Sequence, residues 1–232
     1  MKRFISILCL GLSFTCLAHP DPLMLQNLKP VLSKRLFIGV ISLMRRSFSP
    51  LAHQDGRDLV IYSDYDSHWP QAFARRWDSD QVLVHGGMAG LPGSTADSFA
   101  LTLCHELGHL YGGLPYSDIH NQISVEGQAD YWATEVCFPQ IIAALPSRTP
   151  SRDSLKYCDG KIDCARTLDA ALVMTAFFAD NRRIPHPKVS TPDESVAHEV
   201  LLTHPEPQCR LDTFWAGIHQ RLRPRCWMPT IL

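Results

Sequence analysis

The chain has 232 residues, of which 45% are apolar and 19% are charged, and its formal net charge is −1. This composition indicates a folded globular protein. It excludes a disordered chain and any main partner chosen by opposite charge, such as a nucleic acid or an anionic bilayer. No interior stretch approaches the roughly 18 uninterrupted apolar residues of a spanning helix, so we expect no integral membrane span in the mature chain.

Residues 1–18 have the pattern of a secretory signal peptide, because two basic residues precede an apolar run that ends in the small-x-small sequence Cys16-Leu17-Ala18. We expect cleavage after Ala18, export to the periplasm or beyond, and a single domain over residues 19–232. An uncleaved anchor helix is the alternative, although about 15 apolar residues are short for a bilayer. A lipoprotein modified at Cys16 is a further alternative, but the residues before Cys16 match its processing signal poorly.

The first part of the mature chain predicts one long helix and two short strands. Apolar residues at near-helical spacing over 20–48 favour an amphipathic helix, with Pro30 as a candidate break. Apolar, β-branched runs at 59–62 and 81–85 are typical of strands, and we expect 69–77 between them to be helical or irregular.

The best-marked helix follows at 99–111. Ser94 and Asp97 form a Ser-x-x-Asp capping box before it, and two glycines close it. The chain has no internal repeat, and it therefore predicts one α+β domain that is mostly helical, with a small sheet next to this helix. Three further helices are expected at 125–138, 165–179 and 209–222.

The charges are distributed unevenly along the chain. Between Arg76 and Arg148 there is no Lys or Arg, while eight carboxylates occur. We expect a bound divalent cation, arginines from the C-terminal part, or both to offset this negative charge. A solvated acidic face is the alternative.

The best-marked helix contains the motif His105-Glu106-Leu107-Gly108-His109. Residues four apart lie on one face of a helix, so both imidazoles can bind one ion. Zinc is commonly bound by histidine side chains. Bound zinc lowers the pKa of its water to about 7, which makes the water a nucleophile. Glu106 beside the ligands would be the general base.

A catalytic zinc site needs a third protein ligand. The metzincin pattern fails, because Pro115 occupies the position of its third histidine. The gluzincin pattern fits, because Glu126 would bind the metal and Asp130, four residues on, would accept the ring N–H of a liganding histidine. His120 is the rival third ligand.

The cysteines indicate disulfide bonds. Of the eight in the chain, two lie in the predicted signal peptide and six remain. An even number in an oxidising compartment favours disulfides, and spacing favours only local pairs such as Cys209 with Cys226. A thiolate zinc site is the alternative, but no Cys-x-x-Cys pair is present. The six are Cys104, Cys137, Cys158, Cys164, Cys209 and Cys226.

Taken together, the motifs resemble a family: gluzincin peptidases related to the prenyl-protein (CAAX) endopeptidase and to the bacterial heat-shock membrane protease, which include soluble periplasmic members. The matching segments follow the family's order. They are Gln71-Ala72-Phe73-Ala74, His105 to His109, Glu126-x-x-Ala129-Asp130, and Thr203-His204-Pro205 with Arg210.

The resemblance implies a zincin-like fold and further roles. His204 and Arg210 would lie across the cleft and help to stabilise the developing oxyanion, and strand 81–85 would pair its backbone with an extended peptide. The chain departs from the family in having Gln71 in place of Asn, extra cysteines, and neither membrane helices nor helical repeats.

The sequence therefore predicts an exported endopeptidase with one zinc ion per chain and a polypeptide substrate. Zinc would be held by His105, His109 and Glu126. One alternative is a zinc-bearing chaperone or scaffold of envelope proteins, and another is hydrolysis of a non-peptide amide or ester. The physiological substrate, latency, the disulfide pairing and the oligomeric state stay open at this level.

Overall fold

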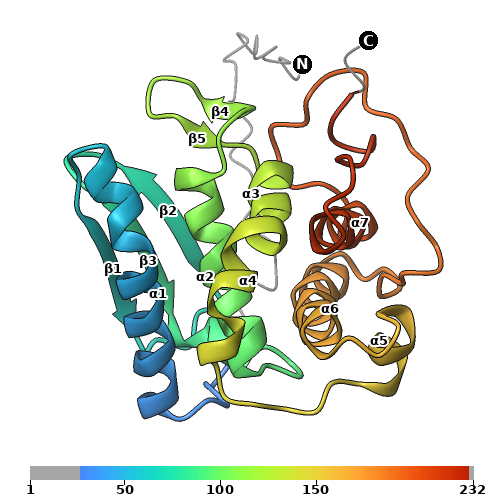
Figure 1. The fold of residues 1–232 in the computed structure, drawn as a ribbon, viewed down its shortest axis with the longest axis horizontal. Helices are drawn as coiled ribbons and strands as arrows, with labels where there is room; N and C mark the ends of the chain where they lie inside the picture. Colours follow the sequence, from blue (N-terminus) through green and yellow to red (C-terminus); the bar gives the residue numbers. More distant parts are fainter. Residues whose placement is uncertain (1–26, 230–232) are drawn as a thin grey trace, which may run out of the picture.

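The computed structural model describes residues 27–229. The predicted signal peptide lies outside this range. The described chain combines helices with a three-stranded and a two-stranded sheet, which confirms a mixed α+β protein (Figure 1). None of the helices in the described part is long and apolar enough to cross a membrane.

The first helix, α1, runs over Lys34–Gln54. The helix predicted over 20–48 is confirmed from residue 34 onward, is absent over 27–33 and extends beyond residue 48; residues 20–26 lie outside the described range. The helix begins after Ser33, whose side chain accepts a hydrogen bond from the Leu36 N–H, and it continues through Pro50. Its apolar face is buried, so packing against the rest of the molecule outweighs the helix-breaking tendency of proline.

The larger sheet contains β1 (Leu59–Asp64), β2 (Ala72–Arg76) and β3 (Asp80–His85) in the order β1-β3-β2. β1 is parallel to β3, and β2 is antiparallel to it. The strands predicted at 59–62 and 81–85 are confirmed with small extensions.

Two expectations about this sheet were wrong. Segment 69–77, expected to be helical or irregular, contains β2, whose sequence Ala-Phe-Ala-Arg-Arg has few strand-favouring residues and is held extended by its pairing with β3. Strand β3 lies in the middle of the sheet, so it has no free edge. The edge beside the predicted metal helix is β2 (Figure 1).

The predicted metal helix is α2, over Ala96–Tyr111. Its capping box is formed by Thr95 and Ser98, one residue later than expected, because Asp97 faces inward and pairs with Arg166. Fourteen of its 16 residues are buried, so α2 is the central element around which α1, β2 and the later helices pack (Figure 1).

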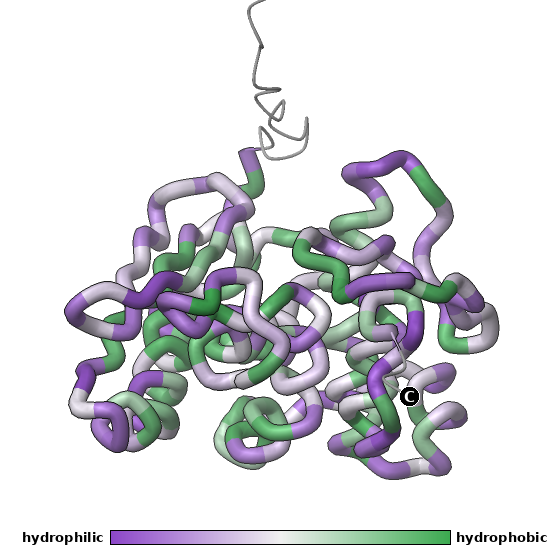
Figure 2. Tube along the Cα trace, turned by 90° about the horizontal axis from the view of Figure 1, so that it is seen from above, coloured by the Kyte–Doolittle hydropathy of each residue, from purple (hydrophilic) through white to green (hydrophobic). Residues whose placement is uncertain are grey.

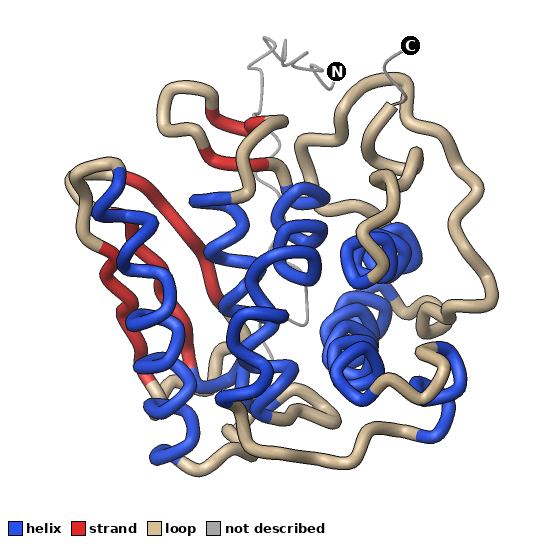
Figure 3. Tube along the Cα trace, viewed as in Figure 1, coloured by secondary structure: helices blue, strands red, loops and turns tan. Residues whose placement is uncertain are grey.

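After the short strands β4 and β5, the rest of the described chain is helices and loops (Figure 3). The helices predicted at 125–138, 165–179 and 209–222 are present with shifted ends, whereas α5 was not predicted. The elements are η1 (Gly86–Gly90), β4 (Tyr116–Asp118), β5 (Ile123–Ser124), α3 (Glu126–Trp132), the π-helix η2 (Ala133–Cys137), α4 (Phe138–Ile141), η3 (Ile142–Ala144), α5 (Arg152–Tyr157), α6 (Ile162–Arg182) and α7 (Pro207–Ile218).

Three disulfide bonds join Cys104 to Cys137, Cys158 to Cys164, and Cys209 to Cys226. They account for all six cysteines outside the predicted signal peptide and confirm the local pair that spacing favoured. They also fit an exported protein, because such bonds persist in oxidising compartments. The apolar core surrounds α2, while hydrophilic residues recur along the outer loops (Figure 2).

Candidate metal centre

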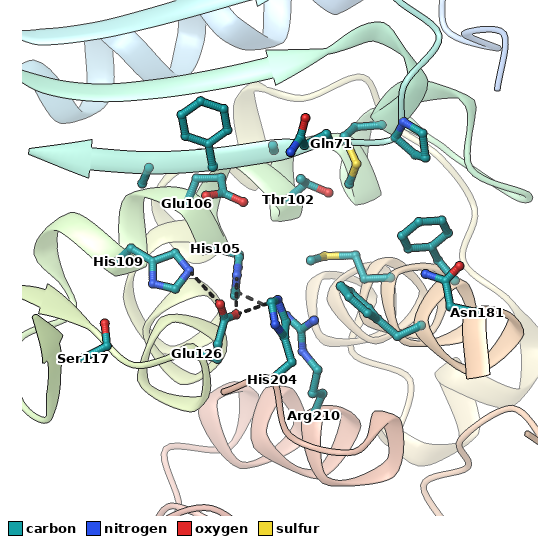
Figure 4. Close-up of a pocket in the computed structure, with 18 of the residues that line it drawn as sticks. Gln71, Thr102, His105, Glu106, His109, Ser117, Glu126, Asn181, His204 and Arg210 are labelled. Atoms are coloured by element: carbon teal, nitrogen blue, oxygen red, sulfur yellow. Dashed lines mark hydrogen bonds and ion pairs between the residues drawn. The ribbon is translucent and has the colours of Figure 1, made fainter. Parts of the chain in front are cut away.

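Helices α2 and α3 bring three possible ligands together (Figure 4). His105 and His109 project from α2, and Glu126 is the first residue of α3. One ligand atom from each lies within 4.8 Å of the others. The two helices approach closely at Gly108, where a Cβ would lie only 2.7 Å from the Ala129 carbonyl oxygen.

These three residues fit a zinc ion. Two imidazole nitrogens and one carboxylate are a common catalytic donor set, which leaves a fourth position for water or substrate. Oε2 of Glu126 is buried and has no hydrogen-bond partner among the described residues, although three imidazoles surround the carboxylate. The rival ligand His120 is exposed on the turn between β4 and β5, away from this group.

Both histidines are oriented by contacts at Nδ1. Nδ1 of His109 lies 2.8 Å from the carbonyl oxygen of Ser124, and since a carbonyl only accepts, Nδ1 carries the proton. Nδ1 of His105 lies 2.7 Å from Oδ1 of Asp130, the contact expected from the spacing of Glu126 and Asp130. In both rings Nε2 therefore faces Glu126 and is available to a metal. The role of Ser124 was not predicted, because a backbone carbonyl leaves no signature in the sequence.

Arg210 is held mainly by Asp130. It was predicted to help stabilise the developing oxyanion from across the cleft; its side chain is 1% exposed, and its Nη1 has no hydrogen-bond partner among the described residues. Its Nε and Nη2 donate to the two oxygens of Asp130, each at 2.7 Å, and its guanidinium lies over the ring of Phe178. Asp130 on α3 thus holds Arg210 behind His105, and Arg210 also borders the cavity.

His204, expected across the cleft, lies beside Glu126 and lines the cavity. It comes from the loop between α6 and α7, its side chain is half-exposed, and its Nε2 is 3.2 Å from Oε2 of Glu126 (Figure 4). Burial lowers the pKa of His204 to about 4, although the carboxylate of Glu126 opposes this shift.

The charges of the centre act strongly on one another. Burial raises the pKa of Glu106 to about 7, although a charged His105 opposes the shift. Burial would lower the pKa of His105, but the ion pair and hydrogen bond with Asp130 raise it to about 10 in the metal-free chain. Burial would raise the pKa of Glu126, but the nearby histidines hold it well below its usual range.

A cavity of about 430 Å³ opens over the centre. Strand β2 borders one side, Gln71 lies at the start of this border, and α6 borders the other side (Figure 4). On the α6 side the cavity is lined by three apolar residues of that helix. They are Met174, Phe177 and Phe178.

Comparison of the chain with family models, with curated proteins and with solved structures gave no significant match. The functional interpretation therefore depends on the motif and on the geometry of the site.

Proposed function

We propose that the chain is an exported zinc-dependent endopeptidase of the gluzincin type, with a zincin-like arrangement of a small sheet, a metal helix and a second helix that carries the glutamate. The observation that carries this proposal is the convergence of His105, His109 and Glu126 beneath an open cavity, with Glu106 lining the same cavity. The three disulfides support export to an oxidising compartment.

When bound, zinc would supply a Lewis acid and lower the pKa of its water to about 7. Glu106 would accept a proton from the attacking water and deliver it to the leaving amine. Glu106 lines the same cavity as the three ligands, which places it where this proton transfer would occur. His204, half-exposed beside the ligands, would donate its ring N–H to the developing oxyanion.

The free edge of β2 suits an extended polypeptide. The His85 N–H donates to the Gln71 carbonyl, so Gln71, Phe73 and Arg75 are the hydrogen-bonded positions of the β2–β3 pair. The backbone N–H and C=O groups of Ala72 and Ala74 therefore point toward the free edge, and both residues line the cavity. A substrate strand can pair there.

Two features favour internal bonds of a polypeptide over its ends. The cavity lies along a strand edge, and Arg182, which also lines it, is paired with Glu206 at 2.6 Å and is therefore not a free cation for a terminal carboxylate. The apolar side of the cavity formed by Met174, Phe177 and Phe178 would receive an apolar side chain next to the bond that is cleaved.

The decisive experiment compares three variants of the chain beginning at His19, produced in an oxidising compartment. We expect one zinc per chain and cleavage of casein by the unmodified protein. Glu106→Gln should keep zinc and lose at least about a hundredfold in turnover, because the general base is removed. Glu126→Ala should lose both metal and activity. Glu199→Gln, an exposed control, should change neither.

Zinc content by atomic absorption and release of casein fragments are the two measurements. Stoichiometric zinc in Glu126→Ala would contradict the third-ligand assignment. Two results together would favour the zinc-bearing chaperone or scaffold over the peptidase. One is stoichiometric zinc without cleavage of any polypeptide, and the other is unchanged binding of an envelope protein by Glu106→Gln.

A further inference from the structure

A second cavity, of about 400 Å³, forms a groove between α1 and the segment that follows α4. Its walls are aliphatic, with Leu36, Val40 and Leu43 on one side and Ala144, Leu145 and Pro146 on the other. None of these residues belongs to the candidate metal centre. The size and the apolar lining are those of a small-molecule binding site.

Gly39 keeps this groove open in the middle. It lies inside α1, where glycine costs about 1 kcal/mol relative to alanine. Its φ is not positive, and a Cβ built on it would meet nothing within 4 Å. Neither backbone conformation nor crowding therefore requires a glycine here, and the effect of the missing side chain is to leave space in the groove.

The groove is positively charged at both ends. Arg35 and Arg46 line it, and 11 residues of helix place them about 16 Å apart on nearly the same face. Helix α1 carries four Lys and Arg residues and no carboxylate. Within residues 27–229 neither arginine forms an ion pair, and no acidic residue lines the groove.

The two ends differ in their surroundings. Arg35 lies in the first turn of α1, where the unpaired backbone N–H groups and the helix dipole favour an anion and no acidic side chain is present. Arg46 is exposed in the middle of the helix, so its aliphatic stem can flank the groove while its guanidinium stays in water. The end at Arg35 is therefore the better place for a negative charge.

The chemistry of the groove limits its occupant. Between the two arginines its walls are aliphatic and offer no side-chain hydrogen-bonding partner. An extended peptide would leave its backbone N–H and C=O groups without partners against the aliphatic walls. An unbranched alkyl chain has no such groups.

We propose that this groove binds a single-chain anionic amphiphile, such as a long-chain fatty acid. The alkyl chain lies over Gly39 between Leu43 and Leu145, and the carboxylate pairs with Arg35 at the start of α1. The planar guanidinium of arginine is well suited to a carboxylate.

The test is a titration of the chain from His19 with cis-parinaric acid, a fluorescent 18-carbon fatty acid. We expect saturable binding of one molecule per chain. Gly39→Leu, which fills the groove, should weaken binding at least tenfold, and Gly39→Ala should leave it within threefold. Arg35→Gln and the uncharged methyl ester of the probe should each lose at least tenfold. Arg46→Gln should lose less than threefold, and Arg152→Gln, an exposed control on α5, should bind normally.

Thermal unfolding shows whether the variants are folded. Gly39→Leu should melt no lower than the unmodified chain, because leucine is the better helix former and its Cβ has no atom within 4 Å. Ala144→Trp blocks the groove from its other, exposed wall and should abolish binding in the same way. Undiminished binding in both blocking variants would overturn the proposal. Equal binding of acid and ester, or binding only to phosphatidylglycerol vesicles and not to the monomeric probe, would also overturn it.

Discussion

At the scale of single residues, the orientation of His105 depends on a chain of charged contacts. Arg210 holds both oxygens of Asp130, and Asp130 contacts Nδ1 of His105. Because a buried carboxylate would otherwise rotate or become protonated, the arginine keeps it charged and fixed in place. Arg210 is thus a positioning residue that acts through Asp130.

Arg210→Lys tests this role. Lysine keeps the charge but loses the two-pronged contact, so we expect zinc affinity to fall about tenfold while the fold persists. Competition with a chromogenic chelator measures the affinity. Arg182→Lys is the matched control, because Arg182 lines the same cavity but is paired with Glu206. Equal zinc affinity in Arg210→Lys and the unmodified chain would contradict the positioning role.

At the scale of elements, β2 is paired on one edge and free on the other. The backbone groups of Gln71, Phe73 and Arg75 form hydrogen bonds with β3. The backbone groups of Ala72 and Ala74 point to the free edge, and both residues line the cavity. Proline is tolerated in a sheet only where its missing N–H points to a free edge. Position 74 meets this condition, whereas position 73 does not.

Ala74→Pro should therefore leave the fold intact and remove one hydrogen bond to the substrate. We expect KM for a polypeptide substrate to rise about fivefold with little change in kcat, which corresponds to about 1 kcal/mol. Steady-state kinetics on a fluorogenic peptide measures the effect, and Ala74→Ser is the control because it keeps the N–H. An unchanged KM in Ala74→Pro would show that substrate does not pair with this edge.

The disulfides join elements at different sequence distances. Cys104–Cys137 links the metal helix to η2 across 33 residues, whereas Cys158–Cys164 spans only 6. In the chain-entropy model the longer loop contributes about 3 to 4 kcal/mol and the shorter about 2 kcal/mol. Urea unfolding of the two double Cys→Ala variants should show the larger loss for the 104–137 pair. The reverse order would mean that native-state packing, not loop length, decides their contributions.

At the scale of the whole molecule, two buried carboxylates of the stretch without basic residues are balanced by arginines distant in the sequence. Arg166 on α6 donates to both oxygens of Asp97 on α2, and Arg210 on α7 does the same for Asp130 on α3. The expectation of C-terminal arginines is therefore confirmed for these two carboxylates. The remaining group, around Glu126, is where we propose the metal.

The Asp97–Arg166 pair ties the C-terminal helices to the metal helix. Arg166→Met would leave Asp97 buried without its main partner and should destabilise the chain by about 3 to 5 kcal/mol. The double variant Asp97→Ala with Arg166→Met should recover at least half of this loss, because no unpaired charge remains. Denaturant unfolding of the single and double variants measures both effects, and an equally unstable double variant would argue that packing matters more than charge.

Local patterns were sufficient for several features. Helical spacing and glycine boundaries located the metal helix, β-branched runs located β1 and β3, and cysteine number and spacing indicated disulfides. Local sequence patterns did not predict β2, because its strand conformation comes from pairing with β3 and not from its own residues. They also did not predict the role of Ser124, whose contribution is a carbonyl oxygen.

The sequence by itself determined which side chains can form the centre, because residues four apart on a helix share a face: His105 with His109, and Glu126 with Asp130. Only the tertiary structure decided that the two faces meet, that β2 has the free edge, and that Arg210 lies behind His105. The physical reason is that these features depend on contacts between residues far apart in the chain, where close packing and the pairing of buried charges outweigh local preference.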